Sequence, residues 1–179
     1  TGTNSLNLGA GNVSMNADRQ ITISANTLTL GGTISQTTRT LTKTGAGTLS
    51  FGSSAVTLNG LSISAGTLTS TSSTMSLTGN FSNSGTFTHN SGTVNFNGTG
   101  LQTITGSTTF STLKINNSTE TTLANAITVN TLTIGDITSN SVFNDNGFQL
   151  TSNGTLNLTS GTFKLGSSGT ATVFPAFAT

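Results

Sequence analysis

The sequence of 179 residues has no Cys, no Trp and no Tyr, and Pro175 is its only proline. Without Cys, disulfides and thiolate metal sites are excluded. Charge is also scarce, because Asp, Glu, Lys and Arg make up 5% of the chain and the formal net charge is +1. Such a chain has no broad field to attract nucleic acid or an anionic lipid surface. No stretch approaches the roughly 18 apolar residues of a membrane helix. We therefore expect no nucleic-acid partner and no membrane insertion.

The residues that fill the chain are Thr, Ser, Asn and 22 glycines, with a hydrophobic share of 31%. A disordered chain would be rich in Pro, Glu, Lys or Gln, whereas this chain is rich in β-branched Thr, Ile and Val. Its apolar residues alternate with polar ones, as in Leu49-Ser50-Phe51, Val56-Thr57-Leu58 and Leu156-Asn157-Leu158. Alternation with period two predicts short strands with one apolar and one hydroxyl-rich face.

Turn-forming residues separate these strands, and no helical periodicity is present. The clearest turns are predicted at Gly31-Gly32, Gly45-Ala46-Gly47, Asn59-Gly60, Ala65-Gly66, Asn97-Gly98, Asn146-Gly147, Asn153-Gly154 and Ser160-Gly161. Two folds suit many short strands with such corners, an antiparallel β-sandwich and a β-solenoid. A sandwich needs longer strands and bulky residues between its sheets, whereas a solenoid needs only two or three inward residues per strand. We favour the solenoid and keep the antiparallel sandwich as the alternative.

A Gly-Thr-apolar motif supports the solenoid. Its glycines at Gly47, Gly66 and Gly85 are equally spaced, and the later copies are less regular. The spacing is a plausible length for one solenoid coil. At roughly 20 residues per coil, the chain would form about nine coils. We expect residues 1–179 to be a single β-solenoid domain, either a segment of a longer repetitive chain or a filament subunit.

Residues 43–68, KTGAGTLSFGSSAVTLNGLSISAGTL, resemble the autotransporter-associated β-strand repeat of bacterial passenger domains. Residues 79–179, with GNFSNSGTFTHNSGTVNFNGTGLQTITG at 79–106 and ITVNTLTI at 127–134, resemble the wider class of repetitive bacterial surface proteins. The first resemblance implies a right-handed parallel β-helix displayed outside the cell. Neither resemblance carries over a catalytic residue, a cofactor or a ligand set.

The acidic residues do not predict a catalytic or metal site. Polysaccharide-cleaving β-helices need clustered carboxylates. The four acidic residues here are widely separated in the sequence, and we expect each to occupy a turn or surface position: Asp18, Glu120, Asp136 and Asp145. The segment 144–147 has a turn signature and too few acidic ligands for Ca²⁺. His89 is the only histidine and has no carboxylate or second histidine nearby in sequence, so we expect a solvent-facing or corner position.

The basic residues form no run, which again excludes an electrostatic basis for nucleic-acid binding: Arg19, Arg39, Lys43, Lys114 and Lys164. Lys114 and Lys164 occupy the outward position of their strands, where lysine keeps a face soluble and discourages unwanted strand pairing. Six Thr-apolar-Thr motifs begin at Thr27, Thr40, Thr67, Thr86, Thr103 and Thr131. A flat array of outward Thr pairs is what ice-binding solenoids use, but these intervals are irregular and do not predict one plane.

We therefore expect a non-enzymatic, bacterial, extracellular or cell-surface scaffold that assembles end to end, with no cofactor and no catalytic or metal site. Its ends would expose unpaired strand edges without a charged or helical cap, which favours continuation within a longer chain or self-association into a filament. The alternative is an adhesin segment that binds glycans or other surfaces, although the usual Trp or Tyr stacking platform is absent.

Overall fold

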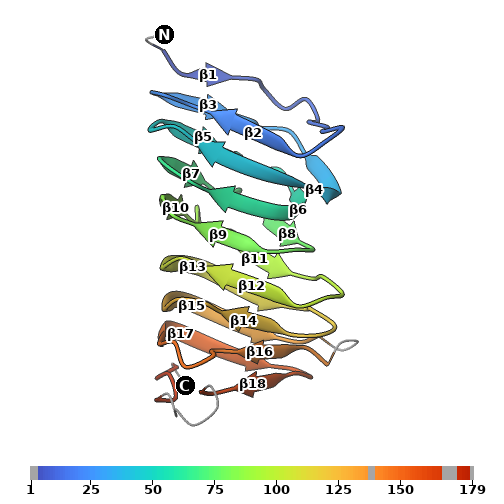
Figure 1. The fold of residues 1–179 in the computed structure, drawn as a ribbon, viewed down its shortest axis with the longest axis vertical. Helices are drawn as coiled ribbons and strands as arrows, with labels where there is room; N and C mark the ends of the chain where they lie inside the picture. The colour runs from blue at the N-terminus through green and yellow to red at the C-terminus, as the bar shows by residue number, and fades with distance from the viewer. Residues whose placement is uncertain (1–3, 137–139, 167–172, 178–179) are drawn as a thin grey trace.

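A computed structural model describes residues 4–136, 140–166 and 173–177. It is all-β in these ranges, and every strand pair is parallel, which confirms the solenoid and excludes the antiparallel sandwich. The chain winds as a right-handed β-helix of about eight coils, with the N-terminus and the C-terminus at opposite ends of the stack (Figure 1).

Each coil has three sides, which we call the first, second and third faces in chain order. The first face consists of β1 (Leu6–Asn7), β3 (Thr27–Thr29), β5 (Thr48–Ser50), β7 (Thr67–Thr69), β10 (Thr86–Thr88), and the opening residues of β13 (Thr108–Ile115), β15 (Ile127–Ile134) and β17 (Leu150–Leu158). The second face consists of the opening residues of β4 (Ile34–Thr44) and β6 (Val56–Ile63), then β8 (Thr74–Leu77), β11 (Thr93–Phe96) and the closing residues of β13, β15 and β17.

The third face consists of β2 (Arg19–Thr22), the closing residues of β4 and β6, β9 (Phe81–Asn83), β12 (Gln102–Thr105), β14 (Thr121–Leu123), β16 (Val142–Asn144) and β18 (Thr162–Lys164). Five strands, β4, β6, β13, β15 and β17, are longer than the alternation predicts because each continues around a corner from one face to the next. The predicted turns at Asn59-Gly60 and Asn153-Gly154 therefore lie inside β6 and β17.

The register between coils explains both the coil number and the irregular repeat. Leu49 is aligned with Leu68, and Leu68 with Phe87, so these coils have the length that the spacing of Gly47, Gly66 and Gly85 predicts. The interval is longer where Leu132 is aligned with Leu156, because some corners hold extra residues. With such longer coils, the chain makes about eight turns instead of nine.

The core is a continuous column of the apolar residues that alternate along the strands. Leu49, Leu68 and Val94 are buried, while the Thr, Ser and Asn residues between such positions face outward. Burial of apolar surface is the main stabilising term in such a column, and each coil contacts only its neighbours. The predicted inward and outward alternation is thus confirmed.

One interruption occurs in the middle of the stack. The first-face ladder stops at β10, which is not paired with β13 in the described structure, whereas the second and third faces remain paired across the same step. Three phenylalanine rings pack at this position, with centroid distances of 5.4 Å between Phe81 and Phe87 and 5.6 Å from each of these rings to Phe110. Side-chain packing therefore replaces backbone hydrogen bonds at this step.

Candidate functional site

The acidic residues lie apart and serve local structure. The Asp18 carboxylate accepts a hydrogen bond from the Thr40 backbone N–H (2.9 Å), and Asp136 accepts one from the Asn116 side-chain amide (2.9 Å). No group of three or more His, Cys, Asp or Glu residues among the described positions could hold a metal ion.

The predicted turn at 144–147 is present, with φ of 52° at Asn146 and 83° at Gly147. Asp145 is not on the surface, however, because its side chain is buried. Its Oδ1 atom accepts hydrogen bonds from the backbone N–H groups of Gly147 (3.0 Å) and Gly166 (2.7 Å). The carboxylate therefore ties this turn to the next coil, which is a structural role.

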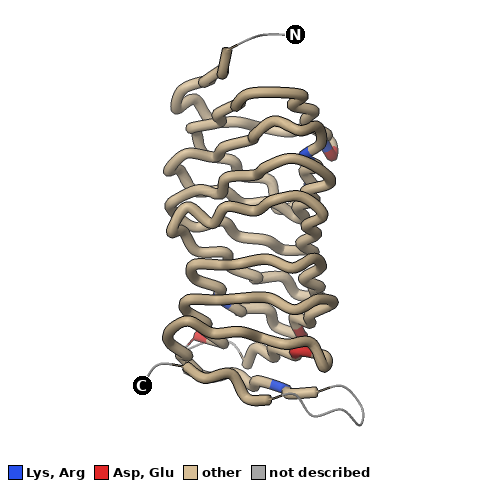
Figure 2. Tube along the Cα trace, turned by 90° about the vertical axis from the view of Figure 1, so that its left-hand side faces the viewer, with Lys and Arg blue, Asp and Glu red and all other residues tan. Residues whose placement is uncertain are grey.

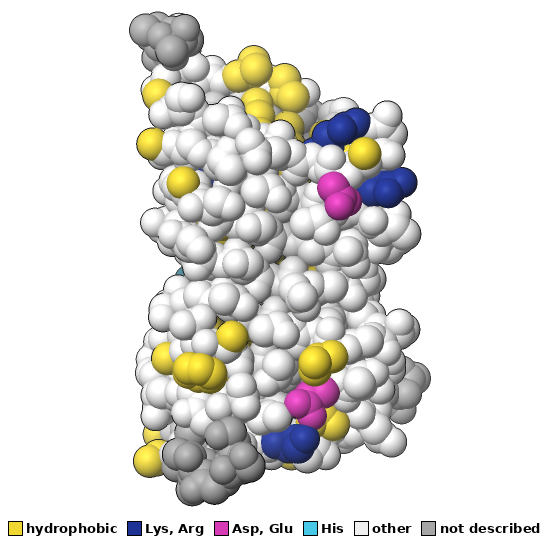
Figure 3. Space-filling view, in the orientation of Figure 1, with side chains coloured by type: hydrophobic (Ala, Val, Ile, Leu, Met, Phe, Trp, Pro, Cys, Tyr) yellow, Lys and Arg dark blue, Asp and Glu magenta, His cyan; other side chains and the backbone are white. Residues whose placement is uncertain are grey.

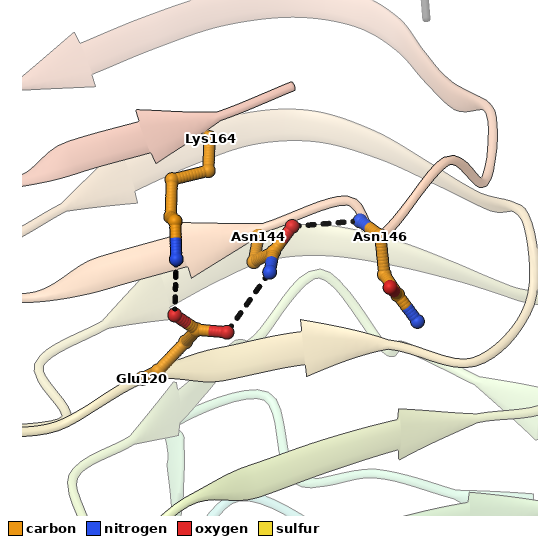
Figure 4. Close-up of polar contacts among 4 residues, drawn as sticks. All are labelled: Glu120, Asn144, Asn146 and Lys164. Atoms are coloured by element: carbon orange, nitrogen blue, oxygen red, sulfur yellow. Dashed lines mark hydrogen bonds and ion pairs between the residues drawn. The ribbon is translucent and has the colours of Figure 1, made fainter. Parts of the chain in front are cut away.

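A charged cluster joins three successive coils on the third face (Figure 4). Lys164 Nζ, on β18, lies 2.8 Å from Glu120 Oε2, and the Asn144 amide on β16 donates to Glu120 Oε1 at 2.9 Å. These two hydrogen bonds, from Lys164 first and Asn144 second, hold the pKa of the Glu120 carboxyl below its ordinary value, although partial burial opposes them. The contact joins residues 44 positions apart along the chain. Lys164 therefore has a specific partner beyond the general solubility role predicted for it.

Lys43 is the largest departure from what the sequence predicts. It lies inward at the end of β4, aligned with Ile21 and Ile63 of the neighbouring coils, and it is fully buried. Its ammonium group donates to the backbone carbonyls of Thr44 (2.9 Å), Gly45 (2.8 Å) and Ala65 (3.1 Å). Burial lowers the pKa of Lys43 below its ordinary value. The signal in the sequence was its place in the inward phase of Leu41-Thr42-Lys43.

A second buried polar group closes the corner between the second and third faces. The Gln102 amide donates to the carbonyls of Leu77 (2.9 Å) and Gly79 (2.5 Å) and accepts from the Gly98 N–H (2.9 Å) and from Asn117 (2.7 Å). Gln102 and Asn117 are both buried, and all four contacts are internal. This network stabilises the corner. The donors and acceptors of the Gln102 amide all bind other protein groups, so the amide is not available to bind a ligand.

The remaining single candidates lie near the predicted positions. His89 is a corner residue after β10, where its Nδ1 atom accepts a hydrogen bond from the Ser91 N–H (3.0 Å). Lys114 projects outward from the second face, as predicted. On the flank of the stack, Leu101 is 61% exposed beside a shallow hollow that includes Asn59 and Asn80. Both amides already contact neighbouring groups, so the hollow indicates no particular ligand.

The first face carries a regular array of hydroxyl groups. Four successive strands, β3, β5, β7 and β10, align two outward columns: Thr27, Thr48, Thr67 and Thr86 in one, and Thr29, Ser50, Thr69 and Thr88 in the other. We call these eight residues the hydroxyl array. No Lys, Arg, Asp or Glu lies on these strands, as Figure 2 shows from that side. Three of the six Thr-apolar-Thr motifs thus share one face, although their intervals along the chain are irregular.

The irregular spacing of the Thr motifs arises because they lie on different faces. The motifs at Thr27, Thr67 and Thr86 belong to the first face, and Thr48-Leu49-Ser50 completes the set. Those at Thr40 and Thr103 lie on the third face, and that at Thr131 lies on the second. Extra residues are accommodated at corners, so the aligned strands keep their register even where coil lengths differ.

The two ends of the stack are apolar. At the N-terminal end, Leu8 is 55% exposed beside a hollow lined by core side chains such as Val13, Met15 and Ile21. Hydrophobic side chains gather there at the top of Figure 3, whereas most of the visible flank is uncharged and polar. At the other end, Leu158 is 52% exposed, and Phe174 (56% exposed) lies 6.0 Å from Phe163, measured between ring centroids. A charged or helical cap is absent from both ends in the described ranges.

Comparisons with known proteins give no assignment: no family model, no curated protein and no solved structure matches the chain. The described part of the chain also has no helix with the length and apolar character needed to span a bilayer.

Proposed function

We propose that the protein is an extracellular structural scaffold of a bacterial surface, whose coils continue end to end into a filament or a longer rod. The observation that carries this proposal is the contrast between its ends and its flanks. Exposed leucines lie at both ends, while the sides of the stack are covered mostly by uncharged hydroxyl and amide groups. Apolar surface concentrated at an exposed strand edge favours burial against another coil.

The ends also differ in shape. The N-terminal end is hollow, with Leu8 and Met15 at its wall, whereas Val173 and Phe174 project at the C-terminal end and Phe177 packs against the core. A projecting apolar group on one end and an apolar hollow on the other suit a head-to-tail contact, which extends into an open chain of subunits. Each buried leucine or phenylalanine would contribute about 1.5–3 kcal/mol.

The chemistry of the flanks supports a structural role. The described residues contain one ion pair, Glu120 with Lys164 (2.8 Å), and no clustered carboxylates or histidines. Because so few groups titrate, the surface of the rod is insensitive to pH and salt over a wide range. Such inertness is useful in a component that has to give length and stiffness outside the cell.

Sedimentation velocity over a range of concentrations, with electron microscopy of the same samples, tests the proposal. We expect the wild-type protein to associate into fibres whose axial repeat matches one subunit. Leu8→Lys places a charge in the N-terminal hollow and should abolish association, because an unpaired charge would be buried in the contact. Leu101→Lys, which changes an equally exposed leucine on the flank, is the matched control and should leave association unchanged.

Protein that stays monomeric at high concentration, or fibres that survive Leu8→Lys, would contradict assembly between copies. Binding of the monomer to immobilised glycans would instead favour the adhesin function, with the hollow beside Leu101 as the place to examine first.

A further inference from the structure

We propose that the hydroxyl array of the first face binds the surface of ice. This activity is separate from the scaffold function and does not depend on it, because the array lies on the side of the stack and not at its ends. Four properties of the array carry the inference: its register, its free hydrogen-bonding groups, its rigidity and its lack of charge.

The register produces a two-dimensional lattice. Neighbouring strands of a sheet are about 4.8 Å apart, and alternate residues on one strand are about 6.6 Å apart. Thr48 and Ser50 are aligned one to one with Thr67 and Thr69, and these with Thr86 and Thr88. The hydroxyl groups therefore form rows that repeat on the same scale as the oxygen atoms on the prism faces of hexagonal ice.

The hydroxyl groups of the array are available to water. Within the described structure, none of the eight donates to or accepts from another protein group, and all eight side chains are partly or fully exposed. Some outward hydroxyls elsewhere are engaged, as between Thr22 and Thr44 (2.8 Å) and from Thr119 to the Thr99 carbonyl (2.8 Å). The array therefore offers two aligned columns of hydroxyl groups to water.

The array is also rigid and uncharged. Thr has few χ1 rotamers in a strand, and neighbours in the same column restrict them further, so little side-chain freedom is lost on binding. The methyl groups between the hydroxyls limit the orientations of adjacent water. A charged group would organise water around itself instead. The second face, which also aligns Thr74, Thr93 and Thr112, carries Lys114 and Asn95 in its other column.

The second face therefore provides an internal control. Thr67→Tyr puts a bulky ring in the middle of the hydroxyl array, on β7. Thr112→Tyr makes the same change at an outward Thr in the middle of the second face, on β13. Ser50→Thr supplies the one methyl group that the array lacks. Circular dichroism and thermal unfolding of each variant verify that the fold is retained.

Thermal hysteresis and partitioning into a growing ice hemisphere are measured on the full chain. We expect activity in the wild-type protein, a several-fold loss in Thr67→Tyr, no change in Thr112→Tyr and a gain in Ser50→Thr. Wild-type protein without activity would overturn the proposal, as would equal effects of the two Tyr variants. A Thr67→Tyr variant that dissociates a dimer, with no effect on ice, would show that the array instead contacts a second copy. The Leu8→Lys variant leaves the hydroxyl array intact. A failure of end-to-end assembly, seen by sedimentation, is therefore distinguished from a failure of ice binding, seen by thermal hysteresis.

Discussion

At the scale of single residues, the most informative position is Lys43. Lysine is rarely fully buried, because its ammonium group must leave water. Here the cost is offset by hydrogen bonds to three backbone carbonyls, two at the corner after β4 (Thr44 and Gly45) and one in the next coil (Ala65). The residue therefore acts as an internal clamp that joins the corner after β4 to the corner of the next coil.

Replacing Lys43 with Met keeps an unbranched side chain that lacks only the terminal ammonium position, and it removes the three hydrogen bonds. We expect the free energy of unfolding to fall by about 2–4 kcal/mol, since three partly buried carbonyls would lose the ammonium group as a donor. Urea denaturation followed by circular dichroism measures this change. Lys114→Met, at an outward position of the second face, is the control and should change stability by less than about 0.5 kcal/mol. Equal losses in the two variants would disprove the clamp.

At the scale of strands, Glu120 joins the start of β14 to β16 and β18. Its folded-state pKa is lowered, so the contact stabilises the protein above the ordinary pKa and is lost as pH falls through the folded value. We expect Glu120→Gln to lower the free energy of unfolding at pH 7 by less than about 1 kcal/mol, because Lys164 is half exposed.

Denaturation at a series of pH values provides the measurement. The difference between wild type and Glu120→Gln should shrink as the pH is lowered below the ordinary pKa of a glutamate carboxyl and through the lower folded-state pKa of Glu120. The Lys114→Met variant, which removes a lysine without this carboxylate partner, should show no such convergence. A difference that stays constant with pH would mean that Glu120 contributes packing alone.

The corners between strands depend on the conformation of particular glycines. Gly66 has φ of 68°, and a Cβ atom added there would overlap the carbonyl oxygen atoms of Gly45 and Gly47. We expect Gly66→Ala to destabilise the fold by more than about 1–2 kcal/mol, from backbone strain and from this overlap. Gly100, where an added Cβ would meet no atom within 4 Å, is the control. Thermal unfolding distinguishes the two; a stable Gly66→Ala protein would contradict the corner geometry.

The sequence allows much of the coil interior to be predicted and little of what lies between coils. Leu49 and Leu68 are identified as core by alternation alone, since period two assigns the faces of a strand. Lys43 is missed because composition places lysine at the surface, although alternation places it inside. The Glu120–Lys164 contact and the hydroxyl array are not predictable from the sequence, because both depend on which residues are aligned in neighbouring coils. The corners differ in length, so the spacing of residues along the chain does not reveal this alignment.

At the scale of the whole molecule, the step between β10 and β13 lacks strand pairing on the first face, so two faces are paired there instead of three. In a linear array of coils, stability depends on each interface between neighbours. We expect amide hydrogens along β10 and residues 108–110 to exchange faster than those of β5 and β7, which are paired on both sides. Hydrogen exchange with mass spectrometry measures this; uniform protection would show that the phenylalanine cluster fully compensates.

The separation between constant faces and variable corners has a practical outcome. A coil with extra corner residues stacks beside a shorter one without disturbing the alignment of Leu132 with Leu156 or Leu113. Strand pairing sets the axial distance between neighbouring coils. Extra residues at a corner therefore enlarge the cross-section of that coil and leave the distance between coils unchanged. A foreign peptide inserted near Gly100, where an added Cβ would meet no atom within 4 Å, should accordingly leave the stacking of the coils unchanged.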